Sequence, residues 1–327
     1  MDTSTHIVMG IGLGGLATID PAVATNPVMP GAVMVATLIG SQAPDFDTIL
    51  KLRNNAVYIR NHRGLTHSIP AVIIWSFLIS TIIALFVSDA SWLTLLLWTF
   101  IAVFLHVFVD IFNAYGTQAL RPFSNKWIAL GIINIFDPFI FASHVVAIML
   151  WWTALAPPGP VFFGLYSLLI LYYCWRIKEK RNVVRNARSL HPDATHIFVS
   201  PSIRWNQWHL VIRTPQMLYV AESRHRNINF FERYQFVPIP ETTIINAARK
   251  DPNLSAFLSF SPTYRWEVDE SSEGMQEVRF YDLRYRSKGH YPFVAIVQMD
   301  ENLEIVSSYT GWVFSEETLQ KKLKVVT

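Results

Sequence analysis

The sequence predicts an α-helical polytopic membrane domain, with about four to six transmembrane helices, followed by a small cytosolic α+β domain that is mainly antiparallel β. Two observations lead to this fold class. Hydrophobic residues make up 51% of the 327 residues, and the long uncharged stretches all lie before residue 176. After about residue 190 the chain consists of short β-branched and aromatic segments separated by Pro, Asn, Asp and Gly. We therefore expect a transmembrane domain over 1–175, a basic juxtamembrane segment over 176–189, and a β-rich domain over 190–327.

The uncharged stretches set the number of expected helices, because a membrane span needs about 20 apolar residues. Two shorter stretches, 7–19 and 28–40, are rich in small residues and fit either short spans or a re-entrant hairpin. Four stretches are long enough on their own, and they cover residues 69–88, 91–112, 139–156 and 160–175.

Positive charge predicts the orientation of these helices. If the helices form successive hairpins, the loops 45–63 and 113–137 and the whole region after 175 lie on one side of the membrane. Every Lys and Arg near the membrane falls on that side, which we expect to face the cytoplasm. The protein is thus predicted to be a multi-pass protein of the cytoplasmic membrane with a cytoplasmic C-terminal domain.

Residues 176–189 carry six basic residues and one acidic residue. This composition predicts contact with anionic membrane lipids. Direct nucleic-acid binding is a weaker interpretation, because the domain that follows is nearly neutral.

The ionisable residues of the membrane half are concentrated at the helix ends. His6 precedes the first apolar stretch, "PDFD" (44–47) follows the second, "HRGLTHS" (62–68) precedes the third, and "HVFVD" (106–110) ends the fourth. In the hairpin topology all of these segments reach the same, cytoplasmic face. A His and an Asp within an apolar helix are costly to bury unless they are paired or bound to something.

This residue set predicts a divalent metal site. His106 and Asp110 are four residues apart and point the same way on a helix. Neutral imidazoles with carboxylates suit zinc, and also manganese or iron, and two ions could share a bridging carboxylate. The predicted ligands are His6, His62, His67, His106 and Asp110.

Three further residues are predicted to act beside the metal. Arg63 is suited to neutralise an anionic group such as a phosphate. Asp45 and Asp47 can act as ligands, and either can act as a general base if it is not a ligand. A membrane location for this polar cluster favours an amphiphilic substrate.

Structural explanations remain open for several of these residues. Ser68 and Asp137 fit helix N-caps, a lone His144 is typical of a packed helix residue, and the His106–Asp110 pair could be a structural hydrogen bond. The motif "GIGLGG" (10–15) matches G-x-G-x-x-G but lacks the strand that a dinucleotide fold requires. Its Gly10 and Gly14 are better explained by close helix packing.

The chain resembles the YdjM-type family, and most closely its YfhP-like members from Bacillus-type bacteria. The resemblance lies in the order of His6, "PDFD", "HRGLTHS" and "HVFVD" along the chain, with "YGT" (115–117) shortly after. The family is described as LexA-binding, inner-membrane-associated predicted metal-dependent hydrolases, related in their metal-site logic to zinc-dependent phospholipases C. The resemblance covers about residues 1–180. It implies the same site residues, and it implies a LexA-like transcription factor as a cytosolic partner.

Two functions follow as hypotheses. The first is a membrane-bound metal-dependent hydrolase that uses metal-activated water on an amphiphilic ester, such as a phospholipid or another lipid phosphate. The alternative is a non-enzymatic membrane regulator, whose cytosolic domain binds a partner or influences transcription.

Overall fold

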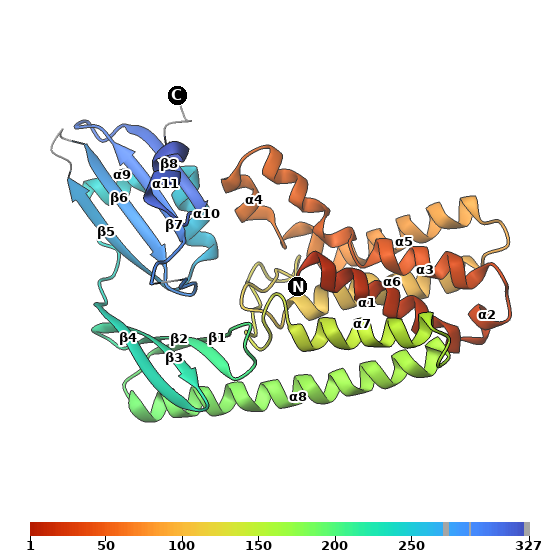
Figure 1. Cartoon of the computed structure of the whole chain (residues 1–327). Coiled ribbons are helices and arrows are strands. Elements are labelled where there is room, and N and C mark those ends of the chain that lie inside the picture. Colours follow the sequence, from red (N-terminus) through yellow and green to blue (C-terminus); the bar gives the residue numbers. More distant parts are fainter. Residues whose placement is uncertain (271–274, 288, 324–327) are drawn as a thin grey trace. The chain divides into compact units, whose positions relative to one another are not determined.

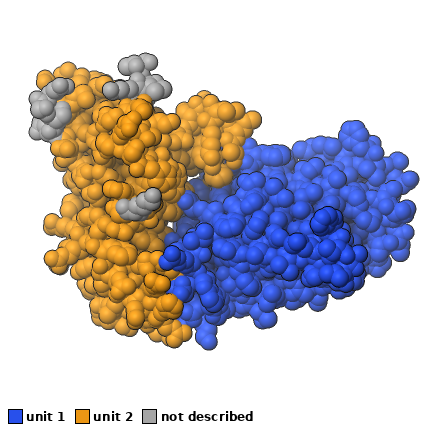
Figure 2. Space-filling view, viewed as in Figure 1, with its two compact units in different colours: residues 1–47, 63–182, 200–206 blue, residues 48–62, 183–199, 207–327 orange. Residues whose placement is uncertain are grey.

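The computed structural model describes residues 1–270, 275–287 and 289–323 (Figure 1). The chain forms two compact units, and neither unit is continuous in sequence (Figure 2). Unit 1 contains residues 1–47, 63–182 and 200–206, and unit 2 contains residues 48–62, 183–199 and 207–327. The predicted fold class is confirmed, because a helical region with several apolar helices precedes two antiparallel sheets.

Unit 1 is built from apolar helices. Three of them are long and apolar enough to cross a membrane: α5 (Ile69–Phe86), α6 (Trp92–Asp110) and α8 (Pro158–Leu190). The shorter elements are α1 (Thr3–Leu16), η1 (Ala17–Ile19), α2 (Pro21–Ala24), α3 (Met29–Gly40), η3 (Leu65–His67) and α7 (Pro138–Trp152). The stretch 139–156, which is one of the four predicted full spans, thus corresponds to α7, a helix of 15 residues.

Local sequence explains where these helices begin. The Ser68 hydroxyl accepts a hydrogen bond from the Ala71 N–H, and Pro70 occupies the first turn of α5. Asp137 caps α7 in the same way, with its carboxylate accepting from the Phe139 and Ile140 N–H groups. Both residues therefore satisfy orphan donors at a helix N-terminus, as their sequence context predicts.

Small residues allow the helices of unit 1 to pack closely. α3 packs against α1, α5 and α6, and α1 also packs against α7. A Cβ atom added to Gly10 would meet Ser41 and Thr37, and one added to Gly14 would meet Met34. These glycines of α1 thus permit the close approach of α3, which is the packing role that their spacing predicts.

Unit 2 contains two four-stranded antiparallel sheets with sequential strand order. The first consists of β1 (His196–Pro201), β2 (Gln207–Arg213), β3 (Met217–Arg224) and β4 (Asn227–Gln235). Its hydrophobic side, which includes Trp208, Leu210 and Ile212 of β2, packs with Val183 and Ala187 of α8.

The second sheet consists of β5 (Tyr264–Glu270), β6 (Gln276–Asp282), β7 (Phe293–Met299) and β8 (Ile305–Trp312). It is covered on both faces, which explains the uninterrupted apolar run of β7. Phe293, Ala295 and Val297 pack in one cluster with residues of α9 (Thr243–Ala248) and α10 (Pro252–Phe260). Val294 and Ile296 pack in another with α11 (Glu316–Leu323).

Residues 48–62 are the unexpected part of unit 2. They contain the end of η2 (Ala43–Leu52) and α4 (Asn55–Asn61), and α4 packs against α10 and β8. Ala56 and Ile59 of α4 are buried in the cluster that contains Leu254 and Phe257 of α10. The predicted boundaries assign this segment to the membrane domain, whereas the structure places it in the core of the unit that contains both sheets.

Candidate metal centre

The polar residues predicted from the sequence meet inside unit 1. α6 supplies His106 and Asp110 from the same helix face, as their spacing requires. η3 supplies His67, and the start of η2 supplies Asp45. The side chains of His67, His106 and Asp110 are fully or almost fully buried, and Asp45 is mostly buried.

Four donor atoms of these residues face one another. They are Asp45 Oδ1, His67 Nε2, His106 Nε2 and Asp110 Oδ2, and all lie within 4.8 Å of one another. The Nε2 atoms of His67 and His106 are 3.3 Å apart. Each Nε2 lies 3.6–3.8 Å from the carboxylate oxygens of Asp45 and Asp110. We call these four atoms the donor set.

The spacing of the donor set fits a tetrahedral metal ion. Ligands at about 2.0–2.2 Å from a zinc ion in tetrahedral geometry lie roughly 3.3–3.6 Å from one another. Three of the five spacings above fall within this range, and the two from His106 Nε2 to the carboxylate oxygens, 3.7 and 3.8 Å, are slightly longer. The residue types fit equally well, because imidazole nitrogen and carboxylate oxygen are ligands for zinc, manganese and iron.

The tautomer of His106 is fixed by its second ring nitrogen. His106 Nδ1 lies 2.7 Å from the Ser41 carbonyl oxygen. A carbonyl oxygen can only accept, so Nδ1 carries the proton and Nε2 presents a lone pair to the donor set.

His67 is oriented by a longer relay. The Thr66 hydroxyl donates to Asp47 Oδ2 at 2.7 Å, because a carboxylate can only accept. The Thr66 oxygen is then the acceptor for His67 Nδ1 at 3.1 Å. His67 Nε2 therefore also presents a lone pair, so the donor set consists of four acceptors without a proton among them. Asp45 Oδ1 and Asp110 Oδ2 have no hydrogen-bond partner among the residues that the structure describes.

Charge favours the ionised form of Asp45. Burial opposes ionisation, but the positive charge of the nearby Arg63 guanidinium lowers the pKa of the Asp45 carboxyl. Asp45 therefore enters the donor set as a carboxylate.

Asp110 connects the donor set to the N-terminal residues. Its Oδ2 belongs to the donor set, while its Oδ1 lies 3.5 Å from His6 Nε2 and contacts the amino group of Met1. The His6 ring stacks on the His106 ring with centroids 3.7 Å apart. His6 therefore lies beside the donor set, and the Met1 amino group contacts both His6 Nε2 and the second oxygen of Asp110.

Arg63 brings positive charge to the same place. Its Nη2 lies 3.2 Å from Asp110 Oδ2 and donates to the Met1 carbonyl at 3.2 Å. Its Nε and Nη1 are buried and have no hydrogen-bond partner within the described part of the chain. Arg63 also adopts a φ of 59°, a strained conformation for a non-glycine residue that is typical of functional sites.

Asp47 holds the loop that carries these groups. Its Oδ2 accepts from the Arg63 backbone N–H at 2.9 Å and from the Thr66 hydroxyl. One carboxylate thereby fixes both the strained backbone at Arg63 and the relay to His67. This arrangement favours a positioning role over the role of general base.

The structure thus brings His6, His67, His106 and Asp110 together with Asp45, Asp47 and Arg63 in unit 1. His62 is different, because it is the C-cap residue of α4 in unit 2 and its ring stacks on Tyr58. Its predicted role as a ligand stays a prediction. Asp137 and His144 are outside the cluster, since Asp137 accepts from the Tyr172 hydroxyl and His144 bonds to the Ile140 carbonyl.

Sequence reasoning missed the residues that support the donor set. Thr66 is expected from the sequence only as part of a helix start, and Asn113 is not expected at all. Asn113 Nδ2 lies 3.4 Å from Asp110 Oδ1, and its own oxygen accepts from the Tyr115 and Gly116 N–H groups. The available signal is its position three residues after Asp110 and before a glycine with a φ of 69°.

Comparisons with known proteins identify the family of the chain. The family profile described as YdjM inner membrane protein matches residues 1–183. The YfhP middle domain matches residues 192–234, and the YfhP C-terminal alpha/beta plait domain matches residues 243–323. An uncharacterized protein YfhP from Bacillus subtilis (strain 168) is 57% identical over 326 residues, which cover 99% of each chain. No solved structure matches the chain. The chain therefore belongs to the YdjM inner membrane protein family, with the YfhP middle and C-terminal domains following the membrane part.

Proposed function

We propose that the protein is a membrane-bound, metal-dependent hydrolase that acts on a phosphate ester of an amphiphilic lipid. The observation that carries this proposal is the donor set, in which four buried lone-pair donors converge without a proton among them. Such an arrangement is electrostatically unfavourable by itself, and a divalent cation would stabilise it.

The donor set assigns a role to each residue. Asp45, His67, His106 and Asp110 would hold the metal, with zinc favoured by the spacing and manganese or iron compatible with the residue types. A divalent metal in this position supplies Lewis-acid activation of water near neutral pH. His6 would support Asp110 from its second oxygen, and Asp47 would act through Thr66 and the Arg63 backbone.

Arg63 supports an anionic substrate. A buried guanidinium with unused donors on Nε and Nη1 is costly, because buried polar groups are normally paired. A phosphate oxygen is a strong acceptor for a guanidinium N–H of this kind. The same atoms therefore favour a phosphate ester over a neutral ester.

The membrane supports the amphiphilic nature of the substrate. The family is an inner membrane protein family, and α5, α6 and α8 can each cross a membrane by length and composition. We propose several crossings with the donor set at the cytoplasmic face, because the basic residues near the helices lie on that side of the hairpin topology. Lipid headgroups occupy this depth.

Metal content tests the proposal directly. Elemental analysis of the detergent-purified protein should give at least one equivalent of zinc, manganese or iron, and His67→Ala/His106→Ala should lose it. His144→Ala is the matched control, because it removes another buried histidine that bonds only to its own helix. Absence of metal in the wild type, even after incubation with each ion, would contradict the proposal.

Activity requires a second experiment. Phosphate release or headgroup release from lipid phosphates, measured by mass spectrometry, should be present in wild type and His144→Ala and absent in His67→Ala. Equal rates in wild type and His67→Ala would contradict hydrolase activity at the donor set. The donor set would then be a binding site without catalysis.

A non-enzymatic membrane regulator is the second candidate function, and residues 48–62 are the observation that favours it. This segment joins Asp45 and Asp47 to Arg63 and His67, yet it folds into unit 2. Binding of a cytosolic partner, such as a LexA-like transcription factor, to unit 2 could therefore act on the donor set along the chain. A regulator should keep its cellular effect in His67→Ala and lose it when unit 2 is destabilised, whereas a hydrolase should lose its effect in His67→Ala.

A further inference from the structure

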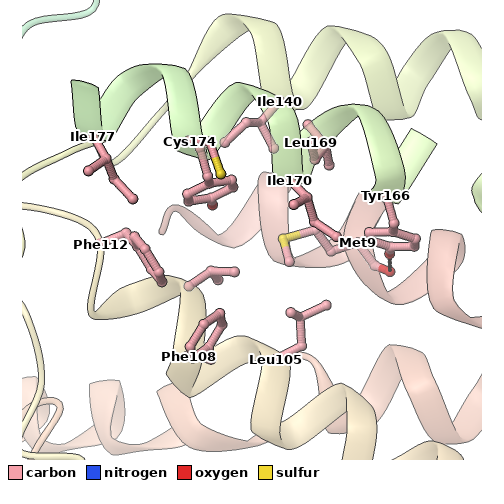
Figure 3. A pocket seen from close by; sticks show the side chains of 12 residues that line it. Met9, Leu105, Phe108, Phe112, Ile140, Tyr166, Leu169, Ile170, Cys174 and Ile177 are labelled. Carbon is pink, nitrogen blue, oxygen red and sulfur yellow. Dashed lines mark hydrogen bonds between the residues drawn. The ribbon is translucent and has the colours of Figure 1, made fainter. Parts of the chain in front are cut away.

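An apolar groove of about 410 Å³ lies within unit 1 (Figure 3). α8 lines one side with residues between Tyr166 and Ile177. The opposite side is lined by Leu105, Phe108 and Val109 of α6 and by Phe112, which follows this helix. Met9 of α1 lies at the back of the groove between these two helices. The groove has a volume in the usual range of small-molecule sites.

The groove offers almost nothing polar to a ligand. The Tyr166 hydroxyl already donates to the Met9 carbonyl at 3.1 Å. The remaining lining side chains are hydrocarbon, apart from the thioether of Met9, the thiol of Cys174 and the phenol of Tyr173. A ligand portion that fits this lining must itself be hydrocarbon.

The length of the groove matches one leaflet of a membrane. Tyr166 and Ile177 are eleven residues apart on one helix, so the lined length is about 16 Å at about 1.5 Å per residue. Half of a hydrocarbon core of about 30 Å is roughly 15 Å. A single acyl or prenyl chain of one leaflet can therefore extend along the whole groove.

The groove and the donor set share the helices α1 and α6. Val109 lines the groove and directly precedes Asp110, and Leu105 holds the same relation to His106. On α1, Met9 is one helical turn from His6. Adjacent residues of the same helices thus face in different directions. Those on one helix face line the apolar groove, and those on another face form or contact the donor set.

We infer that this groove holds one hydrocarbon chain of a phosphate-bearing membrane lipid and directs the headgroup of that lipid to the donor set. The chain enters from the leaflet on the cytoplasmic side, where α6 ends at Asp110. The position of the headgroup in this inference rests on the proposed function. The position of the hydrocarbon chain rests on the groove alone.

Recognition of the chain depends on shape. A lipid chain leaves hydrocarbon to enter the groove, so the hydrophobic effect contributes little, and van der Waals packing against α6 and α8 decides the fit. A side chain that fills the groove should therefore exclude the lipid, whereas an equally large side chain on the neighbouring face of α8 should not.

Ile170 and Leu171 provide this comparison. Both are consecutive residues of α8 and are 64% and 66% exposed, but only Ile170 lines the groove. Ile170→Trp fills the groove without crowding the helix core, and Leu171→Trp adds the same bulk outside it. The probe is a long-chain alkyl phosphate with a photoreactive diazirine at mid-chain, added to each protein in lipid nanodiscs.

Mass spectrometry after illumination should locate the probe on peptides that contain residues 105–112 and 166–177. Ile170→Trp should lower this labelling about tenfold, the effect of overfilling a packed site, and Leu171→Trp should leave it unchanged. Even labelling around α8, or equal effects of the two variants, would overturn the inference.

The readout needs no turnover, so the inference and the proposed function can fail separately. Labelling confined to the groove in a protein that hydrolyses no lipid phosphate would retain the inference and reject the hydrolase. A long-chain alcohol with the same diazirine tests the headgroup, since it should label the groove less strongly than the phosphate. This preference should disappear in His67→Ala/His106→Ala.

Discussion

Thr66 shows how a residue without a metal-binding atom can control the donor set. Its hydroxyl connects His67 Nδ1 to Asp47 and so orients the ring with Nε2 towards the donor set. Thr66→Val should lower metal affinity roughly 10- to 100-fold, which is the usual effect of losing such a supporting hydrogen bond. Competition with a chromogenic chelator measures this affinity. Thr66→Ser, which keeps the hydroxyl, should bind metal like the wild type, and equal loss in both variants would argue against the relay.

Arg63 should act on the anion without acting on the metal. Lysine keeps the charge but cannot supply donors equivalent to both Nε and Nη1. Hydrogen bonds to charged groups are worth about 1.5–3 kcal/mol, so Arg63→Lys should weaken binding of inorganic phosphate roughly 10- to 100-fold. Isothermal titration calorimetry of the metal-loaded protein measures this change. Metal content should stay constant, and unchanged phosphate affinity would exclude Arg63 as the anion ligand.

The residues of the donor set could be predicted, because the energetic cost of burying ionisable groups is visible in the sequence. His106 and Asp110 lie in an apolar helix where ionisable groups are rare, and His67 and Asp45 lie at the ends of apolar stretches. The supporting groups could not be found in this way. The Ser41 carbonyl belongs to the backbone, and the Thr66 hydroxyl has the same sequence signature as a helix cap.

At the scale of elements, α4 is held to unit 2 by buried apolar side chains. Ile59 packs in the cluster that contains Phe257 of α10, so Ile59→Ala should cost unit 2 about 2–5 kcal/mol. Hydrogen–deuterium exchange should become faster in α10 and β8, against which α4 packs. Leu52→Ala is the control, because Leu52 is 86% exposed. Unchanged exchange in α10 would mean that α4 contributes little to this core.

The stability of unit 2 should depend on pH because of His209 in β2. Its Nε2 donates to the Leu283 carbonyl at 2.8 Å, and burial lowers the pKa of His209. The unfolded chain has a histidine pKa of about 6.5. Because the folded pKa is lower, the stability contribution is complete above about pH 6.5 and is lost as the pH falls towards the folded pKa.

The thermal midpoint of unit 2, followed from pH 7.5 to pH 5.5, checks this prediction. The midpoint should fall with acidification in wild type, and it should fall less in His209→Gln, which keeps a donor near Leu283 but cannot titrate. Parallel curves for the two proteins would assign the acid sensitivity to other groups.

Elements with strong periodicity could be predicted, and weak ones could not. The alternation of "WHLVIRT" and the apolar run of "YPFVAIVQM" correspond to β2 and β7. β4 was not predicted, because its sequence "NINFFERYQ" is mostly exposed and mixes charged with aromatic residues. The turn before β4 is formed by His225 and Arg226 with φ of 50° and 71°, where glycine or asparagine would normally mark a hairpin. α10 was not predicted either, although Asp251 caps its first turn and Pro252 begins it.

For the whole molecule, the proposed orientation makes a prediction at two positions. A fluorescent protein fused after Thr327 should be fluorescent in bacterial cells, because we place the C-terminal domain in the cytoplasm. Alkaline phosphatase inserted near Asp89, between α5 and α6, should be active, since this enzyme needs the oxidising side of the membrane. The reverse pattern would invert the topology and move the donor set to the outer face.

The membership of α4 in unit 2 also has a consequence for synthesis. α4 leaves the ribosome nearly two hundred residues before its partner α10 and still earlier than β8. In the meantime α5, α6 and α8, which are long and apolar enough to cross a membrane, are completed while Ala56 and Ile59 still lack the core into which they pack. Domains generally fold in the order in which they are made, but here the first segment of unit 2 cannot be buried until α10 has emerged. A nascent chain arrested before α10 should therefore hold a complete unit 1 and an unfinished unit 2, with α4 open to chaperones and proteases.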